Sequence, residues 1–183
     1  MSPWETEAGK VIWKNQSQFF QWLRGAIRRI WADNPMRKEW KKRQLRPVTK
    51  EEKLEKKFHP STKNVGQCYL CNDWFAGSKL EVDHLLPSDG CKDWETALKF
   101  LEYCACTTGE DWALACKPCH KDKTYAEREG LSFKEAQVIK KAIAIQKQKG
   151  YDSVWLEENG VVPGSNAKVR RQQIVDKLME ECV

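Results

Sequence analysis

Four cysteines stand in two CxxC pairs, a spacing that places two thiolates on one tight turn. The pairs are CYLC, with Cys68 and Cys71, and CKPC, with Cys116 and Cys119. Four thiolates on two such turns are the ligand set of a tetrahedral structural zinc, with Zn–S distances of about 2.3 Å. Buried or redox-active thiols are the alternative. A closed four-sulfur site has no open coordination position, so any catalysis must come from other residues.

Four cysteines lie outside these pairs: Cys91, Cys104, Cys106 and Cys182. The N-terminal MSPWETEAGK lacks the basic and apolar segments of an export signal, and no apolar run approaches the ~20 residues that span a bilayer. We therefore expect a soluble, cytoplasmic protein with reduced thiols and no disulfide scaffold. A second zinc site using Cys91, Cys104 and Cys106 is one alternative, and buried free thiols are the other.

Two of the three histidines flank the cysteine pairs. In KLEVDHLLP, Asp83 and His84 follow a short alternating run, and His120 comes directly after Cys119. A neutral imidazole with an ordinary pKa of about 6.5 can act as a general base at cellular pH. A carboxylate and a second imidazole are suitable ligands for a divalent cation.

Together, CYLC, VDHLLP and LACKPCHKDKT resemble the zinc-knuckle branch of the HNH endonucleases, whose fold is the ββα-metal finger. The resemblance covers about residues 66–125. It implies that His84 is the general base, and that Asp83 and His120 hold one catalytic Mg²⁺ or Mn²⁺. It also implies an endonuclease that cuts double-stranded DNA and leaves 5′ phosphate and 3′ hydroxyl ends. Phage-encoded members of this family carry comparable helical inserts. A phage-encoded chain would act in the cytoplasm of the host cell.

One position departs from the family pattern. The asparagine that gives HNH its middle letter corresponds here to Asp111, five residues before Cys116. A carboxylate can replace the ligand role of that asparagine, but it cannot donate an amide hydrogen bond. We expect Asp111 to belong to the catalytic site, with its role as a metal ligand left open.

Two other functions share this sequence pattern. One is a zinc-knuckle module that binds DNA without cutting it, in which Asp83 and His84 are polar residues at a strand end. The other is a phage accessory protein that engages the packaging or repair machinery. A homodimer would supply the second active site that a double-strand break needs. Near Cys119, Lys121 and Lys123 either contact phosphate or are solvated helix residues.

The expected elements place these residues in a helical frame. Apolar residues recur at helical spacing over 17–31, and the Asn34-Pro35 pair should end that helix. Thr49–Glu52 and Ser132–Glu135 are capping-box sequences. The segment DWETALKFLEYC predicts a helix inserted into the strand-rich middle. Further helices are expected near 152–159 and 166–181.

Basic residues concentrate between Arg24 and Lys57, where 13 Lys or Arg stand against 5 Asp or Glu. Such a segment favours binding to a polyanion through release of counterions. Trp40 lies within the densest cluster, and a smaller cluster lies at Lys168, Arg170 and Arg171. The residues predicted to bind DNA in the dense cluster are Arg37, Lys38, Lys41, Lys42 and Arg43.

Tryptophans recur every nine residues at positions 4, 13, 22, 31 and 40. Nine residues put successive rings on opposite faces of a continuous helix, so this spacing predicts packing anchors and no structural repeat. The prediction is an α+β protein: a ββα-metal core with structural zinc, flanked by N- and C-terminal helices. The segments are 1–65 (basic, helical, DNA-binding), 66–130 (nuclease core with an insert at 89–109) and 131–183 (helical arm).

Overall fold

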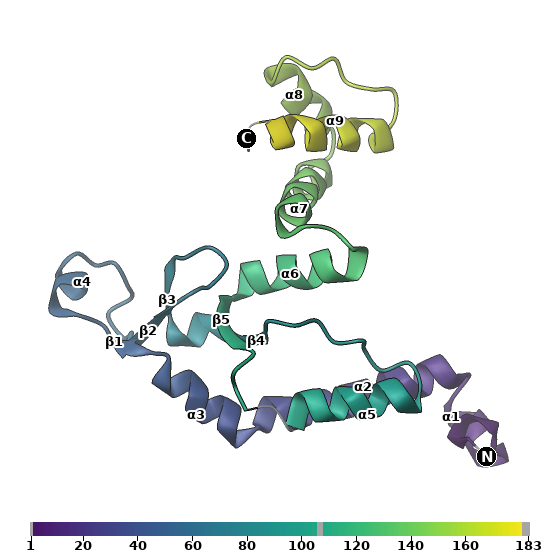
Figure 1. The fold of residues 1–183 in the computed structure, drawn as a ribbon. Helices are drawn as coiled ribbons and strands as arrows, with labels where there is room; N and C mark the ends of the chain where they lie inside the picture. Colours follow the sequence, from purple (N-terminus) through teal and green to yellow (C-terminus); the bar gives the residue numbers. More distant parts are fainter. Residues whose placement is uncertain (1, 106–107, 181–183) are drawn as a thin grey trace. The chain divides into compact units, whose positions relative to one another are not determined.

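The computed structural model describes residues 2–105 and 108–180. Its contacts divide the chain into two compact units, Met1–Lys117 and Pro118–Val183. Helices are combined with small antiparallel sheets (Figure 1), which confirms the predicted α+β class. The three-segment division into 1–65, 66–130 and 131–183 stays a prediction. No helix within the described residues combines the length and the apolar composition needed to cross a bilayer.

The first unit holds five helices and five strands among its described residues. The helices are α1 (Glu7–Ile12), α2 (Gln16–Asp33), α3 (Pro35–Arg43), α4 (Lys50–Leu54) and α5 (Trp94–Ala105). The strands are β1 (Arg46–Pro47), β2 (Asn64–Gln67), β3 (Trp74–Ala76), β4 (Leu80–His84) and β5 (Trp112–Cys116). Short 3₁₀ turns occupy Pro3–Glu5 and Gly77–Lys79. One antiparallel sheet has the order β1-β2-β3, and β4 pairs with β5 in a second.

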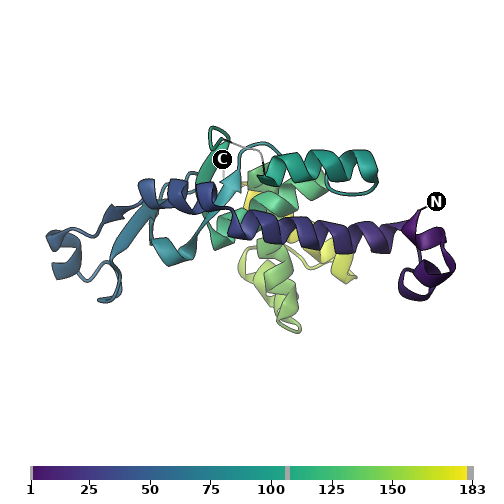
Figure 2. The same ribbon diagram turned by 90° about the horizontal axis from the view of Figure 1, so that it is seen from below.

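Helices α2 and α5 pack side by side, as both views show (Figures 1 and 2). Phe20 and Ile27 of α2 and Phe100 of α5 belong to one buried apolar cluster. Helix α5 is the helix that the sequence predicts as an insert, and its apolar face completes this core. Trp4 and Trp13 pack against the same cluster, which agrees with their predicted role as packing anchors.

The β4–β5 hairpin has a register that separates two sets of candidate residues. Leu80 lies opposite Cys116, and His84 lies opposite Trp112. Four residues of strand separate these two levels, which corresponds to about 13 Å. Val82, Asp83 and His84 are all buried, so the end of β4 is covered on both of its faces.

The second unit is helical within its described residues. Its helices are α6 (Lys117–Glu129, whose first residue belongs to the first unit), α7 (Phe133–Lys147), α8 (Tyr151–Glu158) and α9 (Ala167–Glu180). Ala142, Leu156 and Ile174 form its buried core, one from each of the last three helices. Arg170 bonds to the buried Asp152 at 2.7 Å, joining α9 to α8. That bond holds the pKa of Asp152 below its usual value.

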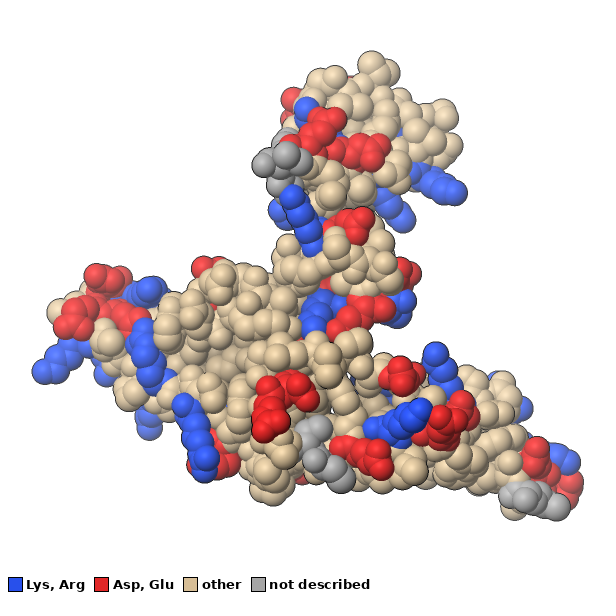
Figure 3. All heavy atoms as spheres, viewed as in Figure 1, with Lys and Arg blue, Asp and Glu red and all other residues tan. Residues whose placement is uncertain are grey.

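The local sequence rules predicted most of the helices. Both capping boxes form, at the starts of α4 and α7, and the helix over 17–31 is observed as α2. Two helices, α1 and α3, were missed. After α2 ends at Asp33, Asn34 caps a new helix, α3, whose first residue is Pro35. Proline suits that position because its missing N–H would have no partner there. Figure 3 shows basic and acidic side chains interspersed over the face in view.

Candidate functional site

The first cysteine pair lies on a tight turn directly after β2. The Cys68 amide donates to the Asp73 carbonyl at 2.9 Å, and the Asn72 amide donates to the Cys68 carbonyl at 2.9 Å. Asn72 closes the turn with a φ of 59°. Asparagine tolerates this left-handed conformation better than most side chains, so the local sequence suits the turn. Cys68 and Cys71 consequently face the same side.

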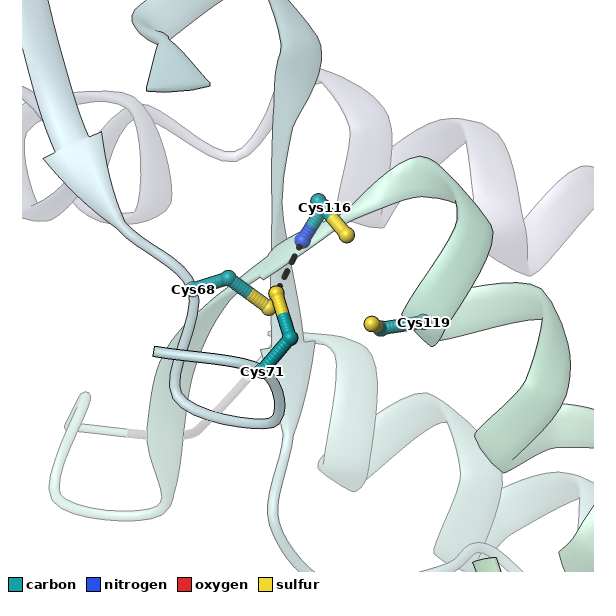
Figure 4. A group of neighbouring side chains, drawn as sticks. All are labelled: Cys68, Cys71, Cys116 and Cys119. Carbon is teal, nitrogen blue, oxygen red and sulfur yellow. Dashed lines mark hydrogen bonds between the residues drawn. The ribbon is translucent and has the colours of Figure 1, made fainter. Parts of the chain in front are cut away.

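The second cysteine pair joins β5 to α6. Cys116 ends the strand and Cys119 lies in the first turn of the helix. The four Sγ atoms lie within 4.8 Å of one another (Figure 4). The Cys116 amide donates to the Cys68 sulfur at 3.3 Å, so the two pairs are also hydrogen-bonded. The donor set suits a metal ion such as zinc, because four convergent thiols are the ligands of structural zinc sites.

The pKa of Cys68 is about 7, below the ordinary value for a thiol. Burial by itself would raise this pKa, but backbone N–H groups of Cys116, Cys71 and Leu70 donate toward the sulfur and outweigh it. These bonds favour the thiolate, which is the form that binds metals. The first pair therefore supplies a ligand that is already close to its metal-binding protonation state.

The cysteines of the α2–α5 core differ from this cluster. Cys91 and Cys104 are buried among apolar side chains, and burial raises the pKa of both thiols, that of Cys104 to about 11. Neutral thiols in an apolar core agree with the interpretation as buried free cysteines. Cys106 and Cys182 lie outside the described residues, so the alternative zinc site that includes Cys106 stays a prediction. Among the described residues, the Cys68 cluster is the one group of three or more ligand-type side chains.

Asp83 lies near the end of β4 and is buried, with 7% of its surface exposed. The Tyr69 hydroxyl donates to its Oδ2 at 3.0 Å. The Tyr69 amide also donates to the Leu114 carbonyl on β5 at 2.9 Å. Tyr69 lies between the two cysteines of the first pair, so the knuckle turn contacts both strands of the hairpin. Sequence reasoning missed Tyr69, although its position inside CYLC marks it as a neighbour of the metal cluster.

His84 is packed between two aromatic rings. Its ring centroid lies 3.8 Å from that of Tyr103 on α5 and 4.2 Å from that of Trp31 on α2, and only 6% of the residue is exposed. Trp112, its partner across the hairpin, stands edge-on at 6.2 Å. The Tyr103 hydroxyl donates to the Leu86 carbonyl at 2.6 Å, which fixes the ring beside the imidazole. No sequence pattern indicated this aromatic enclosure.

The other two predicted catalytic residues lie next to β5 and on α6. Asp111 precedes β5, its side chain is exposed, and its carbonyl accepts the Leu85 amide at 2.7 Å. This bond ties the residue after His84 to the start of β5. His120 is partly buried in the first turn of α6, and its carbonyl accepts the Thr124 hydroxyl at 2.9 Å. The metal-binding roles of Asp83, Asp111 and His120 stay predictions.

All five predicted DNA-binding residues of α3 have partners within the chain. Lys42 and Arg43 approach Glu39 at 3.7 and 3.3 Å, and Lys38 bonds to Asp33 at 3.1 Å. The guanidinium of Arg37 lies over the Trp31 ring and donates to the Ala32 carbonyl, and Lys41 donates to the Leu80 carbonyl at 2.5 Å. Burial lowers the pKa of Arg37 and of Lys41. These side chains stabilise α3 and its attachment, and their contact with DNA stays a prediction.

The basic residues of α6 divide into two kinds. Lys121 is exposed, whereas the Lys123 side chain is only 14% exposed and pairs with Glu127 at 2.6 Å.

Searches against protein-family models, curated proteins and solved structures found no significant match to this chain. The functional proposal therefore rests on the site itself.

Proposed function

We propose that this protein is a metal-dependent endonuclease of the HNH type that hydrolyses phosphodiester bonds of double-stranded DNA. The observation that supports the proposal is one connected arrangement. Asp83 and His84 end strand β4, β4 pairs with β5, and β5 leads through a four-cysteine cluster into α6, where His120 lies in the first turn. His84 as a base, with Asp83 and His120 as two metal ligands, would suit phosphodiester hydrolysis on such a frame.

In the proposed reaction His84 accepts a proton from a water molecule, and the resulting hydroxide attacks the scissile phosphorus. The bond from phosphorus to the 3′ oxygen breaks, the 3′ oxygen takes up a proton, and the products carry 5′ phosphate and 3′ hydroxyl ends. Asp83 and His120 would hold Mg²⁺ or Mn²⁺, and such a cation would stabilise charge on the phosphate and the departing oxygen. Tyr69 would orient the Asp83 carboxylate through its hydrogen bond.

The four-cysteine cluster would hold structural zinc in this proposal. Cys116 and Cys119 flank the junction of β5 and α6, so a metal there would fix the start of the helix that carries His120. Zinc would act through the fold alone, because four thiolates complete its coordination.

One observation favours a second function. The Trp31 and Tyr103 rings cover both faces of His84, an arrangement typical of a packed core histidine. A zinc-knuckle module that binds DNA without cutting it would retain this packing and need no base. The two functions differ in whether a water molecule reaches the His84 imidazole when DNA is bound.

Incubation of supercoiled plasmid with the purified protein and Mg²⁺ or Mn²⁺ separates the two functions. Nicked plasmid is expected with the wild type, and a rate at least about 100-fold lower with His84→Ala. His59→Ala is the control, because His59 is exposed, its Nδ1 bonds to the hydroxyl of Ser61 at 2.8 Å, and it lies outside the β4–β5 pair. His84→Asn, which leaves a smaller void between the rings, and the zinc content of each variant control for folding.

Equal nicking by the wild type and His84→Ala would contradict the assignment of the base. Uncut plasmid that the wild type still retards in a gel would support the non-cleaving module instead.

A further inference from the structure

The connection between β1 and β2, residues 48–63, forms a loop that contains α4; we call it the α4 loop. Strand pairing closes its base, with Pro47 opposite Asn64. The Val48 amide donates to the Lys63 carbonyl at 3.0 Å. Figure 1 shows α4 at the end of this hairpin. The loop is therefore a defined element of the first unit, between two paired strands.

A partly buried ion pair holds the α4 loop in one conformation. Arg46 donates to both carboxylate oxygens of Glu52, at 2.9 and 2.8 Å, and its guanidinium lies 4.0 Å from the centroid of the Trp74 ring. Glu52 also accepts the Thr49 amide and so completes the capping box. A two-point arginine–carboxylate bond fixes geometry as well as charge. The loop is thus ordered before any partner binds, which lowers the entropy cost of binding.

The lysines of this loop differ from the basic residues of α3, which all have partners within the chain. All five are exposed, and none forms an ion pair with any residue that the structure describes; they are Lys50, Lys53, Lys56, Lys57 and Lys63. Three glutamates lie in the same loop, but Arg46 neutralises Glu52. Lys57 also acts on Glu52 through its charge, and the five ammonium groups, which form no ion pair among the described residues, can each turn toward an external anion. The sequence places the densest basic cluster on α3, but these lysines that form no ion pair lie in the α4 loop, together with Glu51, Glu52 and Glu55.

Lys56 has a backbone conformation that favours glycine. Its φ is 53°, and it follows the last turn of α4 in a C-terminal cap. The Lys57 amide donates to the Glu52 carbonyl at 3.0 Å, and the Lys56 amide donates to the Lys53 carbonyl at 3.2 Å. This pair of bonds defines the helix-ending motif in which glycine predominates at the position of Lys56. A lysine held there at a backbone cost is an observation that points to use of its side chain.

We propose that the α4 loop grips the phosphate backbone of DNA through Lys53, Lys56 and Lys57, and contributes more to DNA affinity than the basic residues of α3. The choice of DNA as the polyanion rests on the proposed function. The interaction depends on charge and not on sequence, since lysine bonds to phosphate as a point charge. The loop would hold the duplex while the proposed active site on β4 and β5 acts on it.

The test is the salt dependence of duplex binding by the full-length, zinc-loaded protein, measured by fluorescence anisotropy without added Mg²⁺. The triple variant Lys53→Gln/Lys56→Gln/Lys57→Gln should lower the slope of log K against log salt by up to about 2.7, which is about 0.9 for each phosphate that is no longer neutralised. The matched control Lys38→Gln/Lys42→Gln/Arg43→Gln removes the same number of charges from α3 and should change the slope less. A larger effect of the α3 variant, or no effect of the loop variant, would overturn the proposal.

A single substitution separates binding from folding. Lys56→Gly removes the charge and relieves the backbone, so we expect a melting temperature equal to or above that of the wild type, with a slope reduced by about 0.9. An unchanged slope for Lys56→Gly would exclude that lysine from the DNA-binding surface.

Two further outcomes distinguish this proposal from the nuclease proposal. DNA binding that depends on the loop, without plasmid nicking, would remove the nuclease and leave the role of the loop intact. Plasmid nicking by the wild type, together with loop variants that bind DNA as the wild type does, would remove the role of the loop and leave the nuclease proposal intact. Vesicles rich in phosphatidylglycerol serve as the competing polyanion, and competition as strong as that of duplex DNA at equal phosphate would overturn the choice of nucleic acid.

Discussion

The hydroxyl of Tyr69 donates a 3.0 Å hydrogen bond to Oδ2 of the buried Asp83. Because Tyr69 lies between Cys68 and Cys71, the same turn presents two thiols of the four-cysteine cluster and orients the acid of the proposed catalytic pair. A buried carboxylate without its hydrogen-bond donor is costly, so this bond couples the order of the knuckle to the position of Asp83.

Replacement of Tyr69 tests this coupling. Tyr69→Phe keeps the ring and removes one hydrogen bond, so we expect a loss of about 1 kcal/mol in the free energy of unfolding. Cleavage or its Mg²⁺ affinity should fall by about 10-fold or more, since such supporting bonds orient ligands, while the zinc content stays unchanged. Denaturant unfolding, Mg²⁺ titration of nicking and elemental analysis provide the measurements. Tyr125→Phe on α6 is the control, and an equal effect of both variants would rule out a specific role for Tyr69.

The cysteine cluster predicts one tightly bound zinc per chain. Cys116→Ser should lose that zinc and unfold the hairpin region, because the binding energy of a structural metal contributes directly to folding. Cys91→Ser, which alters a core thiol outside the cluster, should retain the zinc. Elemental analysis and circular dichroism check both outcomes. A purified protein that is folded without zinc would contradict the assignment.

The α4 loop should open in acid. The two bonds from Arg46 lower the pKa of Glu52 from 4.5 to about 2. A lowered pKa stabilises the fold above pH 4.5, and that contribution disappears as the pH falls from 4.5 toward 2. We expect amide hydrogen exchange in residues 48–63 to accelerate over this range. Glu52→Gln should show fast exchange at neutral pH as well, and protection that persists in this variant would show that the ion pair does not hold the loop.

The Cys104 thiol should react slowly with alkylating agents in the native protein. Burial raises its pKa from 9.0 to about 11, so the neutral thiol stabilises the fold below pH 9 and the contribution disappears as the pH rises from 9 toward 11. At about pH 8 its thiolate fraction is about 100-fold lower than in the unfolded chain, and alkylation slows accordingly. Mass spectrometry after iodoacetamide treatment measures this. The same peptide in guanidinium is the control, and equal rates in both states would refute the burial.

The local sequence determined the elements whose causes lie within a few residues. The two capping boxes mark the starts of α4 and α7, and helical spacing predicts α2 and α5. The CxxC spacing predicts the four-cysteine cluster, because each pair lies on one turn and needs no distant contact to orient its thiols. Helix α3 was missed because the Asn34-Pro35 pair both ends one helix and caps the next, and the prediction used only the first property.

The tertiary structure decided the surroundings of those residues. Trp31 and Tyr103 meet at His84 from two helices far apart in sequence, and Lys41 of α3 reaches the carbonyl of Leu80 on β4. Burial, aromatic packing and ion pairing depend on which distant segments the fold brings together, and a local sequence pattern does not contain that information. Residue type and spacing therefore determined which side chains are capable of chemistry. The fold decided which of them are enclosed, which are paired and which keep their charge for a partner.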